Sequence, residues 1–119
     1  MTDKELLELA AKAAGLMVGS DEGEYRYRDD GTWVAGLYAT DNGYPIFWNP
    51  LIDDRDAVRL AVRLRLDLMP GDDDQEASTR DDSVVAMENN GNDPCAALRR
   101  AITRAAAEIA RTTDTGGEA

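Results

Sequence analysis

The sequence predicts an α+β fold, a single domain in which three amphipathic helices pack on an antiparallel or mixed sheet in a sandwich-like arrangement. Three segments repeat apolar residues at helical spacing, and the segments between them are short, β-prone and bounded by turn residues. A length of 119 residues suits one modest core. We expect this domain to span residues 1–112.

The first helix is expected over residues 3–14. Apolar residues recur at positions 6, 7, 10, 11 and 14, which lie on one face of a helix. Thr2 and Asp3 offer a capping side chain at its start, and Gly15 can end it. The apolar face is narrow and rich in alanine, so we expect the helix to pack closely on its neighbour.

All seven aromatic residues lie between Tyr25 and Trp48, and we expect this segment to be the centre of the fold. Tyr25 and Tyr27 alternate with arginines in a first strand, Trp33–Tyr38 form a second, and Tyr44–Trp48 form a third. Together the three strands make an antiparallel meander.

Turn residues separate these strands. Asp30-Gly31 and Asn42-Gly43 suit tight hairpins, because Asn and Gly tolerate the positive φ that such turns require. Pro45 has no backbone donor, so the third strand starts there or lies at a sheet edge.

A second helix is expected over residues 54–65, capped by Asp53 or Asp54, with apolar residues again at helical spacing. Leu66–Met69 then form a short strand that Pro70-Gly71 closes. Ser83–Met87 contain two β-branched valines and return to the sheet.

Residues 71–82, GDDDQEASTRDD, are predicted to be a flexible acidic loop. They hold six acids and one arginine but no large apolar side chain. Such a segment buries too little surface to offset the entropy of ordering.

The third helix has the clearest start, with Asp93 as its cap and Pro94 at its first position. Apolar residues continue on one face to Ile109, and we expect the helix to end near Arg111. Residues 113–119 carry neither a cap nor an apolar anchor and are predicted to be a disordered tail.

The chain is strongly acidic, with 24 acidic and 13 basic side chains and a net charge of -11. Direct nucleic-acid binding is disfavoured, because it depends on clustered lysines and arginines. No stretch resembles a signal peptide or a membrane span, so we expect a protein of the host cell cytoplasm.

The residues needed for common catalytic sites are missing or isolated, and we predict no catalytic, cofactor or metal residues. Histidine, the usual base, is absent, and Cys95 has no basic partner nearby in the sequence, so we interpret it as a small, partly buried residue. The aspartate runs do not match a calcium loop, and the glycines form no phosphate-binding motif.

Three segments, MTDKELLELAAKAAG, WNPLIDDRDAVRLAVRL and DPCAALRRAITRAAAEIAR, resemble small phage and prophage proteins of the phage ABA sandwich domain family. They cover nearly half of the chain, and the Trp48–Leu51 run with its following aspartates is the most specific part. The resemblance implies a sandwich of helices and sheet and a phage accessory role. It supplies no catalytic residues.

These observations favour a non-catalytic protein that binds a host protein with a basic, nucleic-acid-binding surface, in the manner of an inhibitor of host defence (anti-CRISPR-like). The acidic residues of segment 72–82 would attract the partner, and exposed aromatic residues of segment 25–48 would make the contact. The residues expected to bind are Asp72, Asp73, Asp74, Asp81, Asp82, Tyr25, Tyr27, Trp33 and Trp48.

Two other functions remain open. One is a small-molecule or metal-binding enzyme whose site gathers Asp53, Asp54 and Asp56 near Trp48 and Asn49. The other is a structural or oligomeric phage component that self-associates through an alanine-rich helix face. For the Trp48-Asn49-Pro50 corner itself we favour a structural role in packing and in the turn. We expect the arginines of the second and third helices to lie on solvated helix faces.

Overall fold

The computed structural model describes the backbone of residues 2–18, 25–27 and 33–118, and the side chains of residues 2–18 and 36–113. Within these residues the chain forms a single compact α+β domain, as predicted. Its helices are α1 (Asp3–Ala13), α2 (Asp54–Arg63) and α3 (Pro94–Glu118). Their starts agree with those expected from the sequence.

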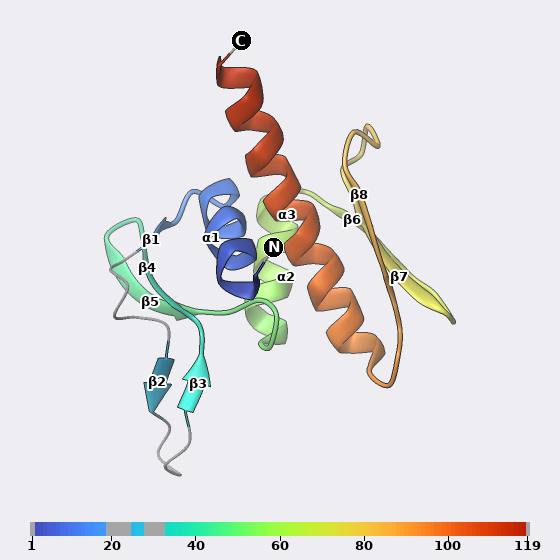
Figure 1. The fold of residues 1–119 in the computed structure, drawn as a ribbon, viewed down its shortest axis with the longest axis horizontal. Helices are drawn as coiled ribbons and strands as arrows, with labels where there is room; N and C mark the ends of the chain where they lie inside the picture. Colours follow the sequence, from blue (N-terminus) through green and yellow to red (C-terminus); the bar gives the residue numbers. More distant parts are fainter. Residues whose placement is uncertain (1, 19–24, 28–32, 119) are drawn as a thin grey trace.

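The described strands belong to two three-stranded sheets and one hairpin, all antiparallel. The first sheet lies beside α1 and the second lies along α3 (Figure 1). The first sheet has the order β1 (Met17–Val18), β4 (Leu37–Asp41), β5 (Tyr44–Trp48). The second has the order β6 (Asp67–Pro70), β7 (Asp74–Ser78), β8 (Val85–Asn89). The hairpin pairs β2 (Tyr25–Tyr27) with β3 (Trp33–Ala35).

The core lies around α3, where small side chains allow close packing. Ala10 and Ala11 of α1 and Ala101 and Ala105 of α3 are fully buried, and α3 also packs on β7 and β8. Alanine lets two helices approach closely and still bury a continuous apolar surface. The aromatic segment contributes Leu37, Ala39 and Trp48 to this core, but within the described residues the centre of the fold is α3, which corrects the expectation. Among the aromatic side chains that the structure describes, only Trp48 is buried.

The turn between β4 and β5 agrees with the sequence. Asn42 and Gly43 have φ angles of 51° and 85°, so both adopt the left-handed conformation of a tight hairpin. β5 is an edge strand, which Pro45 requires.

The predicted strand Trp33–Tyr38 is interrupted at Gly36, so the expected three-stranded meander divides into the β2–β3 hairpin and the β4–β5 pair. A Cβ atom on Gly36 would lie 2.8 Å from the Phe47 ring and 3.1 Å from the Trp48 carbonyl oxygen. The chain passes too close to β5 here for any residue larger than glycine.

The prediction of a flexible loop over residues 71–82 is wrong, because β7 is the central strand of the second sheet. β7 forms backbone pairs with β6 and β8, and its Gln75, Ala77 and Ser78 are buried. The sequence hides this strand because its buried residues are small or polar.

The disordered tail predicted for residues 113–119 also differs from the structure, in which α3 extends to Glu118. The first glycines after Arg111 are Gly116 and Gly117, so no strong helix-breaking residue stands at the predicted end.

Candidate functional site

The predicted acidic residues lie at the two ends of β7 and do not form one loop. Asp72 and Asp73 stand in the β6–β7 turn, Asp74 begins β7, and Asp81 and Asp82 stand in the β7–β8 turn. The five residues of β7 separate the two groups by roughly 14 Å at ~3.4 Å per residue. Any partner that contacts both groups must therefore span the sheet.

The β6–β7 turn is held by Asn90. Its Nδ2 donates to the Asp72 and Gly71 carbonyl oxygens at 2.9 and 3.2 Å, and its Oδ1 accepts from Gln75 Nε2 at 2.8 Å. These bonds leave the carboxylates of Asp72 and Asp73 exposed on an ordered turn.

The β7–β8 turn is organised by Asp81. Its Oδ1 accepts hydrogen bonds from the Ser83 backbone N–H at 3.0 Å and from Thr79 Oγ1 at 2.8 Å. The bond from Ser83, with that from Thr79, lowers the pKa of the Asp81 carboxyl to about 2. Asp81 is therefore ionised across the ordinary pH range and also shapes the turn that presents Asp82.

Between the two turns, one face of the second sheet is open. Met69, Glu76 and Met87 are directly paired across β6, β7 and β8, so they share this face. Met69 is 60% exposed and Met87 is 50% exposed. Neighbouring residues on the strands, Ala77 and Ala86, point the other way and belong to the core.

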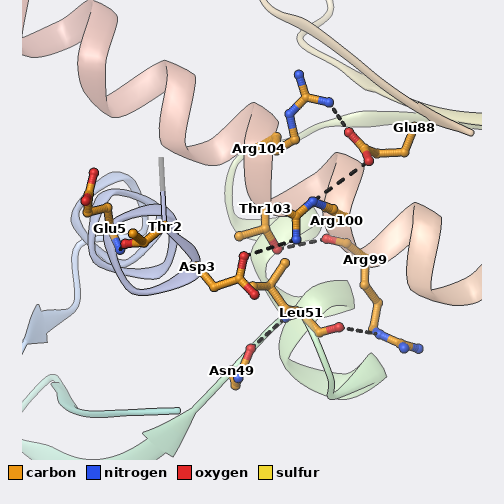
Figure 2. A network of polar contacts seen from close by, with 10 residues as sticks. All are labelled: Thr2, Asp3, Glu5, Asn49, Leu51, Glu88, Arg99, Arg100, Thr103 and Arg104. Carbon is orange, nitrogen blue, oxygen red and sulfur yellow. Dashed lines mark hydrogen bonds and ion pairs between the residues drawn. The ribbon is translucent and has the colours of Figure 1, made fainter. Parts of the chain in front are cut away.

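The second sheet, with its turns, is also the most acidic part of the chain. Residues 67–89 contain eight acidic side chains and one arginine, a net charge of -7 within a total of -11. Glu88 lies on the helix side of the sheet, between Arg100 and Arg104 of α3 (Figure 2). Two exposed methionines thus lie among carboxylates that mostly face solvent.

Of the aromatic residues predicted to bind, Trp48 is wrongly assigned, because it is 5% exposed and packs in the core. The side chains of Tyr25, Tyr27 and Trp33 lie outside the described residues.

The corner that follows Trp48 is a structural turn, as favoured above. Asn49 Oδ1 accepts from the Leu51 N–H at 2.8 Å, and Pro50 is fully buried. Arg99 of α3 holds the corner by donating to the Leu51 carbonyl oxygen at 2.9 Å (Figure 2) and to Asp54 at 2.7 Å. Arg99 is thus largely buried and does not lie on a solvated face.

The three aspartates proposed for an enzyme site each have a different partner. Asp53 caps α2, Asp54 pairs with Arg99, and Asp56 accepts a hydrogen bond from the Asn49 N–H at 2.9 Å. Burial raises the pKa of Asp56, and the Asn49 bond partly opposes this effect. No three metal-ligating side chains gather within the described part of the chain.

A cavity of about 330 Å³ lies beside Asp56, between α2 and the first sheet. The cavity could not be predicted from the sequence, because arginines spaced four residues apart, as on α2, are also typical of a solvated helix face. The cavity is lined by Ala14, Leu16, Asp41, Ile46, Phe47, Trp48, Arg55, Asp56, Arg59, Leu60 and Arg63.

A second hollow lies between α3 and β8, but its central arginines have partners. Arg100 pairs with Asp3 at 3.2 Å, and Arg104 pairs with Glu88 (Figure 2). Arg104 also donates to the Met87 carbonyl oxygen at 3.1 Å. This network joins α1, α3 and β8, so its first role is structural.

Cys95 is exposed at the start of α3, which corrects the expectation of partial burial. Among the described residues, no helix is long and apolar enough to cross a membrane. Comparisons with protein-family models, with curated proteins and with solved structures found no match.

Proposed function

We propose that this protein acts without catalysis, by binding a protein that has a basic surface. The observation that carries the proposal is the open face of the second sheet, where Met69 and Met87 are exposed between two aspartate-bearing turns. Methionine adapts its shape to irregular partners and is common at binding surfaces. The surrounding carboxylates would pair with lysines and arginines at the rim of the contact.

The charge of this face favours one class of partner. A net charge of -7 over residues 67–89 has the same sign as a phosphate backbone. A groove that binds nucleic acid would attract it for the same electrostatic reason. The resemblance to phage proteins supports a host nuclease or defence complex as the target, so that the protein would inhibit by occupying the groove.

The two parts of the face have separable roles. Exposed carboxylates at a rim chiefly accelerate the encounter, whereas desolvated apolar contacts slow dissociation. Neutralising Asp72 and Asp73 should therefore lower the association rate, and replacing Met69 and Met87 should raise the dissociation rate.

The test begins with capture of partners from nuclease-treated bacterial lysate, followed by measurement of binding between the purified partner and variants. Met69→Ser with Met87→Ser should weaken binding about tenfold or more. Met17→Ser is the matched control, because Met17 is also exposed but lies on the first sheet. Equal affinities for the double variant, the control and the native protein would refute the proposal.

A second pair of variants tests the steering role. Asp72→Asn with Asp73→Asn and Glu5→Gln with Glu8→Gln remove the same charge, but the latter pair lies on α1. Only the first pair should slow association and reduce its dependence on salt. An equal change in both pairs would show that net charge alone acts.

A further inference from the structure

The cavity between α2 and the first sheet has the composition of an anion-binding site. Arg55, Arg59 and Arg63 follow one another at intervals of four residues, so they lie on one face of α2. All three line the cavity, and its opposite wall comes from β5.

The charges in this lining are not balanced. Arg63 donates two hydrogen bonds to Asp41, at 3.1 and 3.3 Å, so this pair is satisfied. Asp56 accepts a hydrogen bond from the Asn49 N–H, and its carboxylate faces the fields of Arg59 and Arg55. Three guanidinium groups and two carboxylates leave the lining with one excess positive charge.

Arg55 and Arg59 differ from most arginines of the described chain. Six others, at positions 63, 80, 99, 100, 104 and 111, form ion pairs. The backbone N–H of Arg55 donates to the Asp53 cap, but no hydrogen bond or ion pair joins the guanidinium group of Arg55 or Arg59 to a described residue. Within the described part of a protein with a net charge of -11, two neighbouring guanidinium groups thus lack a carboxylate partner.

Part of the cavity wall is apolar and buried. Trp48 and Leu60 are buried there, and Ile46 is half-buried. A volume of about 330 Å³ is at the lower end of the range for small-molecule sites, ~300–1,000 Å³. The cavity can therefore hold a compact molecule with an apolar body against β5 and a charged group toward α2.

We propose that this cavity binds a small organic anion, with its phosphate or carboxylate group held by Arg55 and Arg59 and its apolar body against Ile46 and Trp48. Guanidinium groups bind both oxyanions through paired hydrogen bonds, so the shared chemistry is a terminal oxyanion on an apolar body. This site is separate from the open face of the second sheet and is independent of the proposed protein binding.

The test uses phenyl phosphate and benzoate as probes, with benzyl alcohol and inorganic phosphate as controls. Binding is followed by amide chemical shifts in two-dimensional NMR spectra of the full chain. We expect at least one organic anion to shift the α2 and β5 signals with a dissociation constant in the millimolar range or below. Phenyl phosphate alone would identify a phosphate ligand, and benzoate alone a carboxylate.

Arg55→Gln with Arg59→Gln should weaken that binding at least tenfold, which corresponds to ~1.4 kcal/mol. Arg65→Gln with Arg80→Gln is the matched control, because it removes the same charge outside the cavity lining. It should bind as the native protein does. Both replaced cavity arginines are exposed, so the fold should persist, and the NMR spectrum itself reports this.

Three results would overturn the proposal. The first is the absence of any shift at α2 and β5 with either organic anion. The second is equal weakening by the two double variants, which would mean attraction to net charge alone. The third is binding of inorganic phosphate as tight as that of phenyl phosphate, since the apolar wall would then play no part.

Discussion

At the scale of single residues, two helix ends share one backbone conformation but differ in the residue that adopts it. Gly15 after α1 and Arg65 after α2 both have positive φ, 77° and 55°. Each helix closes with the same pair of backbone hydrogen bonds. After α1 these run from Gly15 N to Lys12 O and from Leu16 N to Ala11 O. After α2 they run from Arg65 N to Val62 O and from Leu66 N to Ala61 O. Arg65 thus occupies a position that favours glycine.

Replacing Arg65 by Gly should stabilise the protein. The left-handed conformation costs a residue with a side chain ~1–2 kcal/mol, and the greater flexibility of unfolded glycine offsets part of the gain. We expect the free energy of unfolding in urea to rise by ~0.5–1 kcal/mol. Arg65→Gln controls for the lost charge and should have little effect.

The reverse change tests the same reasoning at α1. Gly15→Ala should destabilise the protein by ~1 kcal/mol, because a Cβ there meets no atom within 4 Å and only the φ angle is unfavourable. If Gly15→Ala left the stability unchanged, the strain assigned to Arg65 would be disproved as well.

Asp81 gives a prediction for pH dependence. Its pKa is lowered in the folded protein to about 2, below its ordinary value of 3.8, so its contribution to stability is present above pH ~4 and is lost as the pH falls toward 2. Asp81→Asn should be less stable at neutral pH, and its stability should fall less steeply between pH 4 and 2. Urea unfolding at several pH values measures both. Parallel pH profiles for the two proteins would contradict the assignment.

At the scale of elements, the second sheet depends on a side chain from outside its strands. Asn90 bridges the β6–β7 turn by hydrogen bonds to Gly71, Asp72 and Gln75. These bonds replace the apolar packing that usually orders a strand of this composition. The order of β7 therefore rests partly on one amide.

Removing that amide should loosen β7. Asn90→Ala loses three hydrogen bonds, two of them at the protein surface, and should lower the free energy of unfolding by ~1–3 kcal/mol. Hydrogen exchange of the β7 amides should accelerate more than that of α1. Asn92→Ala is the control, because Asn92 is an exposed neighbour. The same exchange rates in both variants would argue against this role.

Helices and strands differ in whether nearby residues in the sequence are enough to predict them. The helices could be predicted because Thr2, Asp53 and Asp93 cap them, at O···N distances of 3.2, 2.8 and 3.1 Å, and because apolar spacing marks their buried faces. β7 could not, because Gln75 is buried through a bond to Asn90, fifteen residues away. The short β1 was missed for the same reason, since its order comes from pairing with β4.

The open face of the second sheet and the α2 cavity could likewise be predicted only in part from the sequence. The sequence identifies which residues are acidic, but the division of Asp72 and Asp73 from Asp81 and Asp82 depends on β7. Likewise, the spacing of Arg55 and Arg59 is visible in the sequence, yet their cavity exists only because β5 packs opposite α2. Long-range packing decides which charged residues share a surface.

At the scale of the whole molecule, the chain contains two similar halves and a closing helix. α1 is followed by the β1-β4-β5 sheet, and α2 is followed by the β6-β7-β8 sheet, each antiparallel. The helix closures at Gly15 and Arg65 are fifty residues apart. This structural repeat is not apparent in the sequence, because the β2–β3 hairpin is inserted between β1 and β4 and because the side chains of the two halves differ. α3 then packs against α1, α2 and the second sheet (Figure 1).

The halves differ in charge, and this difference has a consequence for stability. The second sheet carries -7 of the net charge of -11, so carboxylates repel one another across it. Salt screens exposed charges, since the Debye length falls from ~30 Å at ~10 mM to ~8 Å at ~150 mM. Raising sodium chloride between these concentrations should therefore raise the thermal midpoint by ~4 °C, or ~1 kcal/mol.

Two variants with the same net charge show whether the repulsion is local. Asp72→Asn with Asp73→Asn should have a higher midpoint at low salt and gain less from added salt than the native protein. Glu5→Gln with Glu8→Gln, on α1, should respond to salt nearly as the native protein does, because these side chains lie away from the second sheet. A midpoint that falls with salt in all three proteins would mean that ion pairs such as Arg100–Asp3 and Arg63–Asp41 outweigh the repulsion.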